Sequence, residues 1–395
     1  MTLSYKFLIL PNKETARKLV EALDACRWLY NELLEKINIA RDEGRKLSTY
    51  ETQNLIPNLK VENPKLNTVY SKVLQMVNYT LHSNIAGLAA LKKRGKKVGH
   101  LRYKGEGWYN TLNYNQSGFK LDQDHGKLHL SKIGDTKIKL HQKIKGRIKA
   151  VVIKREGRNW YAIVQADQEP TPLPETGRSV GIDVGLKAFA VDSDGNSIEN
   201  PRYAEKSSKR LSKYQRKLAR CKKGSNNRKE IKAKIHEIHG RINDQRDDFL
   251  HKLSRHYVNS YDNICIEDLD IKGLKEKGHN TRMHRSIHDA AWAKFTFMLS
   301  YKAQSAGRKL ILVDPRNTTQ RCSNCGSIVR KELSDRVHEC PYCGFVSDRD
   351  YNSSRNILIA GMEQPVVPIE PKPLHYISLM QVLVMKWEAL AFRLG

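Results

Sequence analysis

Two Cys-x-x-Cys pairs near the C-terminus constrain the fold of this chain more than any other feature of its sequence. Cys322 pairs with Cys325 and Cys340 with Cys343, and fourteen residues separate the two pairs. Two such pairs brought together supply the four thiolates of a tetrahedral zinc site, and four protein ligands leave no open position for catalysis. The spacing therefore predicts a small module around one structural zinc ion; a redox-active cysteine pair is the alternative.

The remaining cysteines and the N-terminus indicate the compartment. Cys26, Cys221 and Cys265 bring the count to seven, and an odd, clustered set argues against the disulfide framework of a secreted protein. The apolar run from Phe7 to Leu10 is too short for a signal peptide. No uncharged apolar run reaches about 18 residues, so no membrane span is expected. We expect a cytoplasmic, nucleoid-associated protein of a prokaryote.

The charge of the chain indicates its partners. The 395 residues include 70 Lys and Arg against 42 Asp and Glu, which gives a net charge of +28. Such a field attracts polyanions, and nucleic acid is the commonest of them. The alternative is a generic basic protein. The excess is greatest over residues 205–234, where thirteen Lys and Arg accompany only two acids.

The first half of the chain predicts helices inserted into a β-domain. Residues 2–10 alternate like a strand, and apolar residues at helical spacing then predict one helix up to Gly44 and another from about 67 to 91. Pro57 and Pro64 break the stretch between them. From 101 to 169 the period changes to two, which predicts an antiparallel small barrel that residues 2–10 join. Prolines at 170–174 indicate a domain boundary near residue 175.

The second half predicts a mixed α/β domain. Residues 179–191 read as a strand hairpin, and residues 205–221 with 227–257 read as two helices packed on each other. A buried strand ends in Glu267 and Asp268; a helix from about 287 to 306, a strand over 308–313 and a helix over 353–359 follow. This order of elements predicts a central sheet covered by helices.

Three acids stand out in this second half. Asp183 lies inside an apolar strand, Glu267 ends the next buried strand, and Asp350 lies at a helix entrance. A buried carboxylate costs several kcal/mol unless it is paired or binds metal. Oxygen ligands suit Mg²⁺, and two such ions can hold both reacting oxygens of a phosphodiester. Asp268 and Asp348 are the neighbouring rivals for the second and third positions.

These motifs together resemble the split RuvC domain of the TnpB family, transposon-encoded RNA-guided nucleases similar to type V CRISPR effectors. The resemblance rests on Gly-Ile-Asp183-Val-Gly-Leu, on Ile-Glu267-Asp-Leu, and on Asp-Arg-Asp350-x-Asn-x-x-x-Asn-Ile after the cysteine pairs. It covers nearly the whole chain, including Thr318-Thr-Gln-Arg before Cys322. One departure is Ser353-Ser354, where the family usually has two alanines; both residue types are small, so packing should survive.

The resemblance implies an RNase H-like (RuvC) α/β nuclease domain with an inserted zinc ribbon, and an N-terminal all-β wedge domain with an inserted helical recognition domain. The predicted boundaries are 1–10 and 100–175 for the β-barrel wedge, 11–99 for the helical recognition domain, 176–316 and 347–360 for the nuclease, 317–346 for the zinc-ribbon target-nucleic-acid-binding insert, and 361–395 for a C-terminal tail.

The resemblance also implies an activity and its site. The protein would bind a guide RNA from the transposon end as a monomeric ribonucleoprotein and cut double-stranded DNA beside a short transposon-adjacent motif. Asp183, Glu267 and Asp350 would be the catalytic ligands of two Mg²⁺ ions, with Asp183 bridging them, and the four cysteines would hold one Zn²⁺.

Two sets of side chains are candidate nucleic-acid contacts. The basic candidates are Lys209, Arg210, Lys213, Arg216, Lys217 and Arg220. The candidate stacking groups are Trp28, Tyr30, Tyr50, Tyr79, Trp108 and Tyr109. For both sets the ordinary alternative is a solvated face or a core position.

Two other functions stay open. An RNA-guided protein that represses transcription without cutting would be expected to lose the acidic triad, and this chain keeps it. A transposase acting directly on transposon ends would need a strand-transfer apparatus and an end reader, neither of which is recognisable in the sequence.

Overall fold

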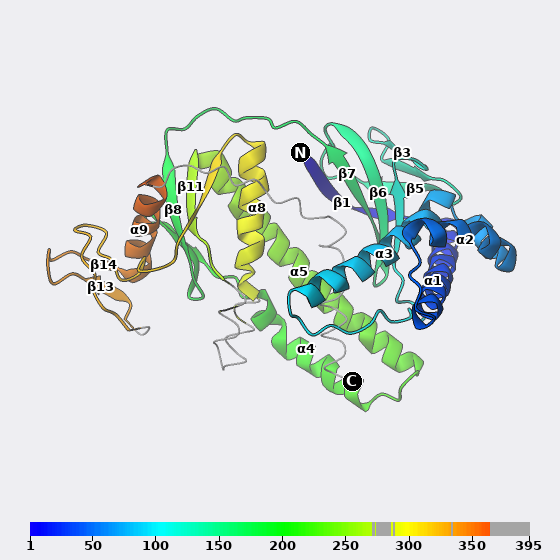
Figure 1. Cartoon of the computed structure of the whole chain (residues 1–395). Helices are drawn as coiled ribbons and strands as arrows, with labels where there is room; N and C mark the ends of the chain where they lie inside the picture. Colours follow the sequence, from blue (N-terminus) through cyan, green and yellow to red (C-terminus); the bar gives the residue numbers. More distant parts are fainter. Residues whose placement is uncertain (271–272, 274–285, 287–288, 333–334, 364–395) are drawn as a thin grey trace. The chain divides into compact units, whose positions relative to one another are not determined.

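The computed structural model describes residues 1–270, 273, 286, 289–332 and 335–363. Within them the chain forms two compact units, one of residues 1–169 and one that begins at Pro170. Figure 1 shows their elements. The predicted tail beyond residue 363 and the predicted helix start at 287 lie outside the described residues. None of the described helices is both long and apolar enough to cross a lipid bilayer.

The first unit combines helices with one antiparallel sheet. Its helical elements are α1 (Lys13–Asp42), α2 (Thr49–Glu62), the 3-10 helix η1 (Pro64–Thr68) and α3 (Ser71–Lys93). Its strands are β1 (Thr2–Leu10), β2 (Thr111–Asn115), β3 (Phe119–Asp122), β4 (Lys127–Leu130), β5 (Gly134–Lys139), β6 (Arg147–Glu156) and β7 (Asn159–Asp167).

The sheet of the first unit joins the start of the chain to residues 111–167. Its order is β2-β6-β7-β1-β5-β4-β3, so β1 lies between β7 and β5 as the alternating pattern predicted. The helices and the sheet share one apolar core that includes Phe7, Leu33 and Val164. The hydrogen-bonded order runs from β2 to β3, and no described pairing joins these two edges. Among the described pairings the sheet therefore has two edges, and the small barrel expected from the sequence stays a prediction.

Helix α2 corrects one expectation, because Pro57 does not break the stretch between α1 and α3. Ser48 caps the helix: its side chain accepts from the Glu51 N–H, and the Glu51 carboxylate accepts from the Ser48 N–H at 2.7 Å. This capping box, together with the burial of Ile56 and Leu59, stabilises a helix that tolerates the missing N–H of Pro57.

The second unit carries the candidate site on a five-stranded sheet. Its strands are β8 (Ser179–Val184), β9 (Ala188–Asp192), β10 (Ser197–Glu199), β11 (Asn263–Glu267) and β12 (Lys309–Val313), with β13 (Val337–Glu339) and β14 (Val346–Asp348) forming a separate hairpin. Its helices are α4 (Tyr203–Arg220), α5 (Asn226–Ser260), α8 (Trp292–Ser305) and α9 (Arg349–Glu363).

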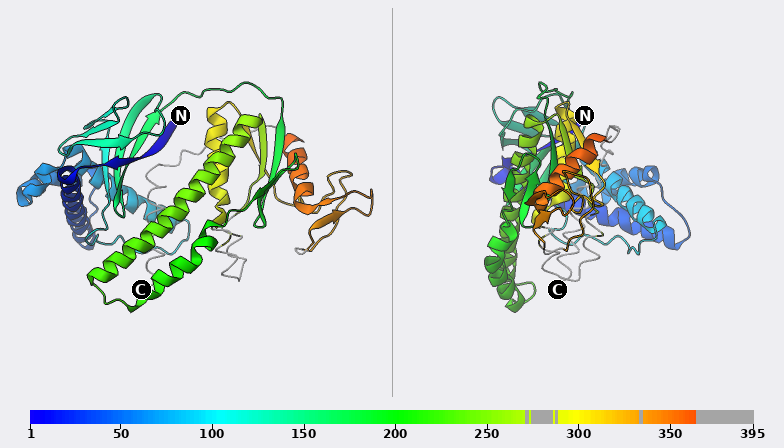
Figure 2. Two further views of the ribbon diagram at one scale, coloured as in Figure 1. Left: turned by 180° about the vertical axis from the view of Figure 1, so that it is seen from behind. Right: turned by 90° about the vertical axis from the view of Figure 1, so that its left-hand side faces the viewer.

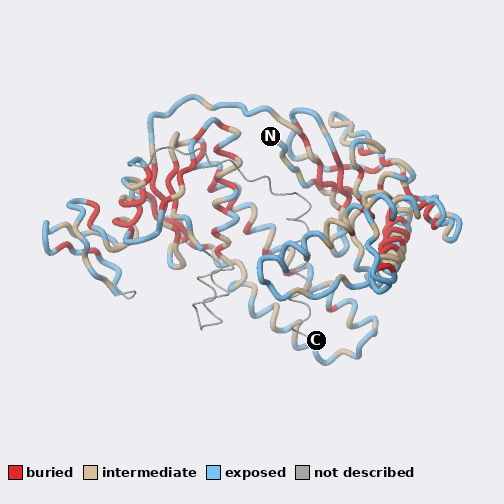
Figure 3. The backbone as a smooth tube through the Cα atoms, viewed as in Figure 1, coloured by how far each residue is buried: buried red, intermediate tan, exposed pale blue. Residues whose placement is uncertain are grey.

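Helices cover both faces of this sheet, whose order is β10-β9-β8-β11-β12. Strands β8, β11 and β12 run parallel, and β9 returns antiparallel to β8. Ile182 and Ile266 face a core made with α5 and α8, and Cys265 and Val313 face α9. Figure 2 shows the sheet between these layers from behind, and Figure 3 shows buried residues filling its strands.

Two glycines let α9 lie directly on the sheet. A Cβ on Gly181 in β8 would stand 2.1 Å from the Ser354 carbonyl oxygen of α9, and a Cβ on Gly361 would stand 2.4 Å from the Cys265 sulfur of β11. Real Cβ atoms do not approach that closely, so only glycine permits this contact. The close approach fixes where the first turn of α9, and thus Asp350, meets the sheet.

We expect Gly181→Ala to lower the free energy of unfolding of the second unit by about 3 kcal/mol or more, since overpacking against backbone atoms cannot relax cheaply. Chemical denaturation followed by circular dichroism measures this change. Gly240→Ala is the matched control: Gly240 lies in α5 with nothing within 4 Å of its would-be Cβ, so the substitution should be neutral or stabilising. Equal stability of both variants would contradict the proposed close packing of α9.

Candidate metal and nuclease site

Asp183 and Glu267 lie on neighbouring parallel strands and face α9. Strands β8 and β11 pair in register up to Ile182 opposite Ile266, so the next residue of each strand follows at the same level. Because side chains alternate along a strand and these isoleucines face the opposite core, the two carboxylates point to the α9 face. Two acids that are 84 residues apart in sequence are thus brought together.

Asp350 lies in the first turn of α9, and the structure separates it from its rival Asp348. The Asp348 carboxylate is exposed and accepts from the backbone N–H groups of Asp350 at 2.8 Å and Tyr351 at 3.1 Å. Asp348 is therefore the helix cap. The Asp350 carboxylate is half-buried and accepts from the Arg349 guanidinium at 3.1 Å.

The second rival is separated in the same way. Asp268 is exposed, and its backbone N–H donates to the Val313 carbonyl oxygen at 2.9 Å, which continues the pairing of β11 with β12. Glu267 is half-buried, and its carboxylate accepts from the Thr318 hydroxyl at 2.6 Å. In both neighbouring pairs, the acid that the motif predicted is the one turned inward.

Asp183 lies in a poorly hydrated place, where the two other carboxylates repel it. Burial raises the pKa of Asp183 well above its usual range, and the negative charges of Glu267 and Asp350 raise it further. The positive charge of Arg349 and the buried hydroxyl of Ser353 lower it only in part, and the Ser353 contact falls short of a full hydrogen bond. Ser353 replaces an alanine usual in the resembled family, so its hydroxyl adds a polar group beside Asp183.

The ionised form of Glu267 is also disfavoured. Burial raises its pKa, and only the hydrogen bond from Thr318 opposes the rise. Among the described residues, the four cysteines alone form a group of three or more metal-type ligands whose atoms all lie within 4.8 Å of one another. The three carboxylates are therefore more widely spaced than a single ion requires. An under-compensated, oxygen-only set suits hard cations such as Mg²⁺.

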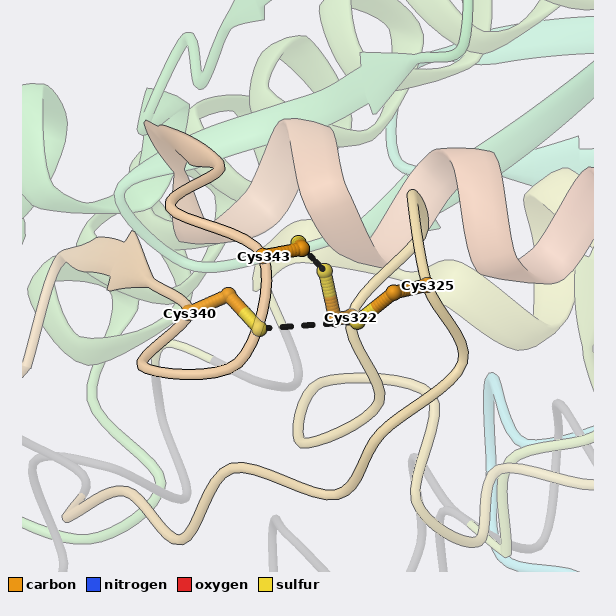
Figure 4. A group of neighbouring side chains, drawn as sticks. All are labelled: Cys322, Cys325, Cys340 and Cys343. Carbon is orange, nitrogen blue, oxygen red and sulfur yellow. Dashed lines mark hydrogen bonds between the residues drawn. The ribbon is translucent and has the colours of Figure 1, made fainter.

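The four predicted cysteines converge as the sequence indicated (Figure 4). The Cys322 and Cys343 sulfurs are 3.7 Å apart and the Cys325 and Cys340 sulfurs 3.6 Å apart. A tetrahedron with metal–sulfur bonds of about 2.3 Å has edges of about 3.8 Å, so the cluster fits zinc. In both pairs a glycine with positive φ, Gly326 or Gly344, follows the second cysteine and closes the turn.

The cluster also has electrostatic support. Hydrogen bonds from Ser327 lower the pKa of Cys325 to about 6, which favours the thiolate that binds zinc. The Lys331 ammonium interacts with the charges of Cys322 and Cys340. It is held by the Thr319 carbonyl oxygen at 3.1 Å and by the ring of the buried His338. A cation held this way offsets part of the negative charge of four thiolates.

The basic candidates all lie on the exposed side of α4, no residue of which is buried (Figure 3). Helix α4 packs on α5 through the half-buried Leu211, Tyr214 and Leu218, at spacings of three and four residues. In the described part of the chain no ion pair joins any of the six predicted cations to a carboxylate. Their charge is left available to an external anion.

The aromatic candidates divide by burial. Tyr30 is 2% exposed and belongs to the core, so it cannot stack on a base as the structure stands. Tyr109 is half-buried and packs against the same core. Trp28 packs partly against the same core. Tyr50, Tyr79 and Trp108 are exposed and stay candidates.

The sequence motifs contain three further polar residues to which sequence reasoning gave no role: Thr318, Asn352 and Asn356. The Asn356 amide donates to the Thr318 and Arg321 carbonyl oxygens, and the Asn352 amide donates to the Arg321 carbonyl oxygen. The spacing of Asn352 and Asn356 could have indicated their role from sequence. Residues four apart lie on one face of a helix, and the other buried residues of α9 are small or apolar.

Three family models match the chain. The family described as "Probable transposase" (OrfB_IS605) matches residues 162–278, the Cas12f1-like TNB domain matches residues 292–357, and a helix-turn-helix domain matches residues 1–46. The first match covers β8, β11 and the α4–α5 hairpin, and the second covers α8, β12, the cysteine cluster and Asp350.

Relatives match over most of their length. A Streptomyces pristinaespiralis protein, named as a candidate RNA-guided DNA endonuclease, is 33% identical over 91% of this chain and 89% of its own. An Escherichia coli K12 protein with the same kind of name, InsQ, is 29% identical over 91% of this chain and 92% of its own.

Fold and site together define a transposon-associated protein with an acidic α/β site and a zinc-type cysteine cluster. The chain belongs to the TnpB family. A cryo-electron-microscopy structure of a Cas12f1–sgRNA–target DNA complex has a similar fold, with a TM-score of 0.52 and 13% identity over 87% of this chain and 82% of that one.

We expect zinc to copurify with the protein and to be lost in Cys340→Ser, because a buried thiolate is replaced by a weaker hydroxyl ligand. Elemental mass spectrometry of the purified protein measures the bound metal. Cys221→Ser is the control, since Cys221 lies outside the cluster and its loss should leave the zinc content unchanged. Equal zinc in Cys340→Ser and wild type would contradict the assignment.

Proposed function

We propose that this chain is an RNA-guided DNA endonuclease that cuts double-stranded DNA beside a short transposon-adjacent motif. The observation that carries the proposal is that Asp183 and Glu267 lie at the same level on neighbouring strands that face α9, where the charges of Glu267 and Asp350 both act on the buried Asp183. Membership of a family whose relatives are named as endonucleases of this kind supports it. A protein that only bound DNA would gain nothing from this destabilising arrangement.

The geometry suggests how the acids divide their work. The Asp183 carboxylate interacts with the charges of both other acids, so it would be the ligand shared by two Mg²⁺ ions. Glu267 and Asp350 would each hold one of them. Bound Mg²⁺ would supply the charge that activates a water and stabilises the attacked phosphate, leaving 3′-hydroxyl and 5′-phosphate ends. The four cysteines would hold one Zn²⁺ with no open position, and so would act structurally.

The α4 side chains would bind the backbone of guide RNA or target DNA. Tyr214, Lys217, Arg220 and Lys234 line a groove of about 600 Å³ between α4 and α5. The Lys234 ammonium lies 5.9 Å from the centre of the Tyr214 ring, which places an aromatic face among cations. In this scheme guide pairing reads the sequence, and the protein contributes backbone contacts and recognition of the short motif. One protein chain would assemble with one guide RNA from the transposon end.

The decisive experiment uses the full chain purified with RNA from its own locus. The complex is incubated with Mg²⁺ and a plasmid library that carries the guide's target beside randomised flanks. We expect double-strand breaks that depend on both RNA and flank, and a loss of at least about a hundredfold in Glu267→Gln or Asp183→Ala, because each removes a metal ligand. Sequencing of the cut ends measures the outcome.

Asp268→Asn is the matched control, because it changes the exposed acid next to Glu267 and should cut as wild type does. Specific binding without cleavage by wild type would instead favour an RNA-guided repressor. RNA-independent cutting at transposon ends would favour a transposase. Either result would overturn the proposal.

The basic surface makes a separate prediction about salt. Lys213→Ala combined with Lys217→Ala should flatten the dependence of log affinity on log salt by about 0.9 for each duplex phosphate that the variant no longer neutralises. Fluorescence anisotropy of labelled nucleic acid at several salt concentrations measures this slope. Lys252→Ala removes one lysine charge from α5, compared with two in the α4 variant, and Lys252 is already paired with Asp248 at 2.7 Å. That control should leave the slope unchanged, and an equal change in both would contradict the role of α4.

A further inference from the structure

Thr318 lies at the start of the cysteine module, the segment of residues 317–346 that contains the four cysteines, and it contacts one of the three acids. Its hydroxyl lies 2.6 Å from Oε1 of Glu267 and 3.1 Å from the Pro315 carbonyl oxygen, and the residue is 6% exposed. A hydroxyl has one proton to donate. Because hydrogen bonds to a carboxylate are stronger than those to a neutral carbonyl, the proton belongs on the shorter contact to Glu267 whenever that acid is ionised.

Helix α9 holds Thr318 in place. The Asn356 amide donates to the Thr318 carbonyl oxygen at 2.8 Å, and Asn356 is itself 4% exposed. Three residues further on, the Arg321 carbonyl oxygen accepts from the amides of Asn356 at 2.6 Å and Asn352 at 2.8 Å. Since α9 also begins with the turn that carries Asp350, a single hydrogen-bonded chain links Asp350's helix to the Glu267 side chain.

This contact changes what Glu267 can offer a cation. One carboxylate oxygen is engaged by Thr318, and within the described residues no second hydrogen bond reaches the other oxygen. The bonded oxygen keeps a second lone pair, but the hydrogen bond makes it the poorer ligand. The carboxylate is therefore oriented to bind a cation through its other oxygen. Ca²⁺ takes six to eight oxygens and often binds carboxylates through both, whereas Mg²⁺ demands octahedral geometry and is bound through single carboxylate oxygens and waters.

We propose that Thr318 is a positioning residue that fixes Glu267 as a one-oxygen ligand and thereby favours Mg²⁺ over Ca²⁺ at the nuclease site. The inference rests on the proposed function, in which Glu267 is a metal ligand. By this inference the cysteine module has a second role besides any contact with nucleic acid, because its first residues orient Glu267, a metal ligand at the end of β11.

The experiment compares three variants of the full chain. Thr318→Val removes the hydroxyl and keeps the shape, and Thr318→Ser restores the hydroxyl. Thr319→Val makes the same chemical change at the next residue, whose described hydrogen bond uses only its backbone oxygen. Mn²⁺ binding is measured by electron paramagnetic resonance, with competition by Mg²⁺ and by Ca²⁺. The binding readout does not depend on cleavage.

We expect Thr318→Val to weaken Mn²⁺ and Mg²⁺ binding by about tenfold or more, the usual effect of losing a hydrogen bond to a metal ligand. Ca²⁺ binding should weaken less, so that the preference for Mg²⁺ falls. Thr318→Ser should restore both values, and Thr319→Val should match wild type. In the cleavage assay the Mg²⁺ concentration for half-maximal rate should rise with Thr318→Val and return with Thr318→Ser.

Three results would overturn the inference. Unchanged metal affinity and selectivity in Thr318→Val would show that the hydroxyl does not position Glu267. Loss of copurified zinc or of thermal stability in Thr318→Val, with no rescue by Thr318→Ser, would show a role in folding alone. A uniform loss of affinity for all three cations would remove the claim about selectivity. Failure of the proposed function is distinct, because wild type would then neither bind Mn²⁺ at Asp183 and Glu267 nor cut DNA.

Discussion

The electrostatic repulsion among three inward-facing carboxylates is the constraint on which the second unit depends. Asp183 and Glu267 occupy level positions on parallel strands, and Asp350 is brought to them by a helix that two glycines allow to lie on the sheet. Such a cluster lowers stability unless a cation binds, since each buried charge raises the cost of the next. The binding of a divalent cation would therefore offset the free-energy cost of this cluster and stabilise the fold.

The cysteine module is fastened to the same helix. Asn352 and Asn356 bind backbone oxygens just before the first cysteine pair, and the Ser323 N–H donates to the Asn352 side chain at 2.9 Å. A zinc-bound cluster is rigid because its ligands are fixed in a tetrahedron. With zinc bound, these hydrogen bonds would hold the start of α9 and, through Thr318, the Glu267 side chain against a fixed cluster. The zinc would thus brace the acidic site without sharing a ligand with it.

Sequence periodicity anticipated much of this arrangement, and the failures have physical causes. The apolar runs around Asp183 and Glu267 indicate buried strands, and the cysteine spacing specifies its own partners, so both were predictable. Helix α2 was missed because a proline outweighed a capping box in the reading of residues 49–62. For the first unit the sequence predicted a small barrel without its strand order, because strand patterns do not report which edges pair. The role of Thr318 was not predicted because it depends on a hydrogen bond to Glu267, which lies 51 residues away. Tyr30 and Tyr50 could not be told apart because the sequence does not show which side of each helix meets the core.

Opposite charges must coexist in the second unit if it is to act on nucleic acid. A polyanion is repelled by three carboxylates, and the exposed cations of α4 lie on a helix with no acidic partner for them among the described residues. Long-range attraction by α4 is weakened by salt, because exposed charges are screened beyond about 10 Å. Salt weakens the binding of cations to the three acids much less, because these carboxylates are largely buried. Affinity for nucleic acid and readiness for chemistry therefore depend on different residues and on different ions, which is why a change in α4 and a change at Thr318 should be separable by salt and by the choice of divalent metal.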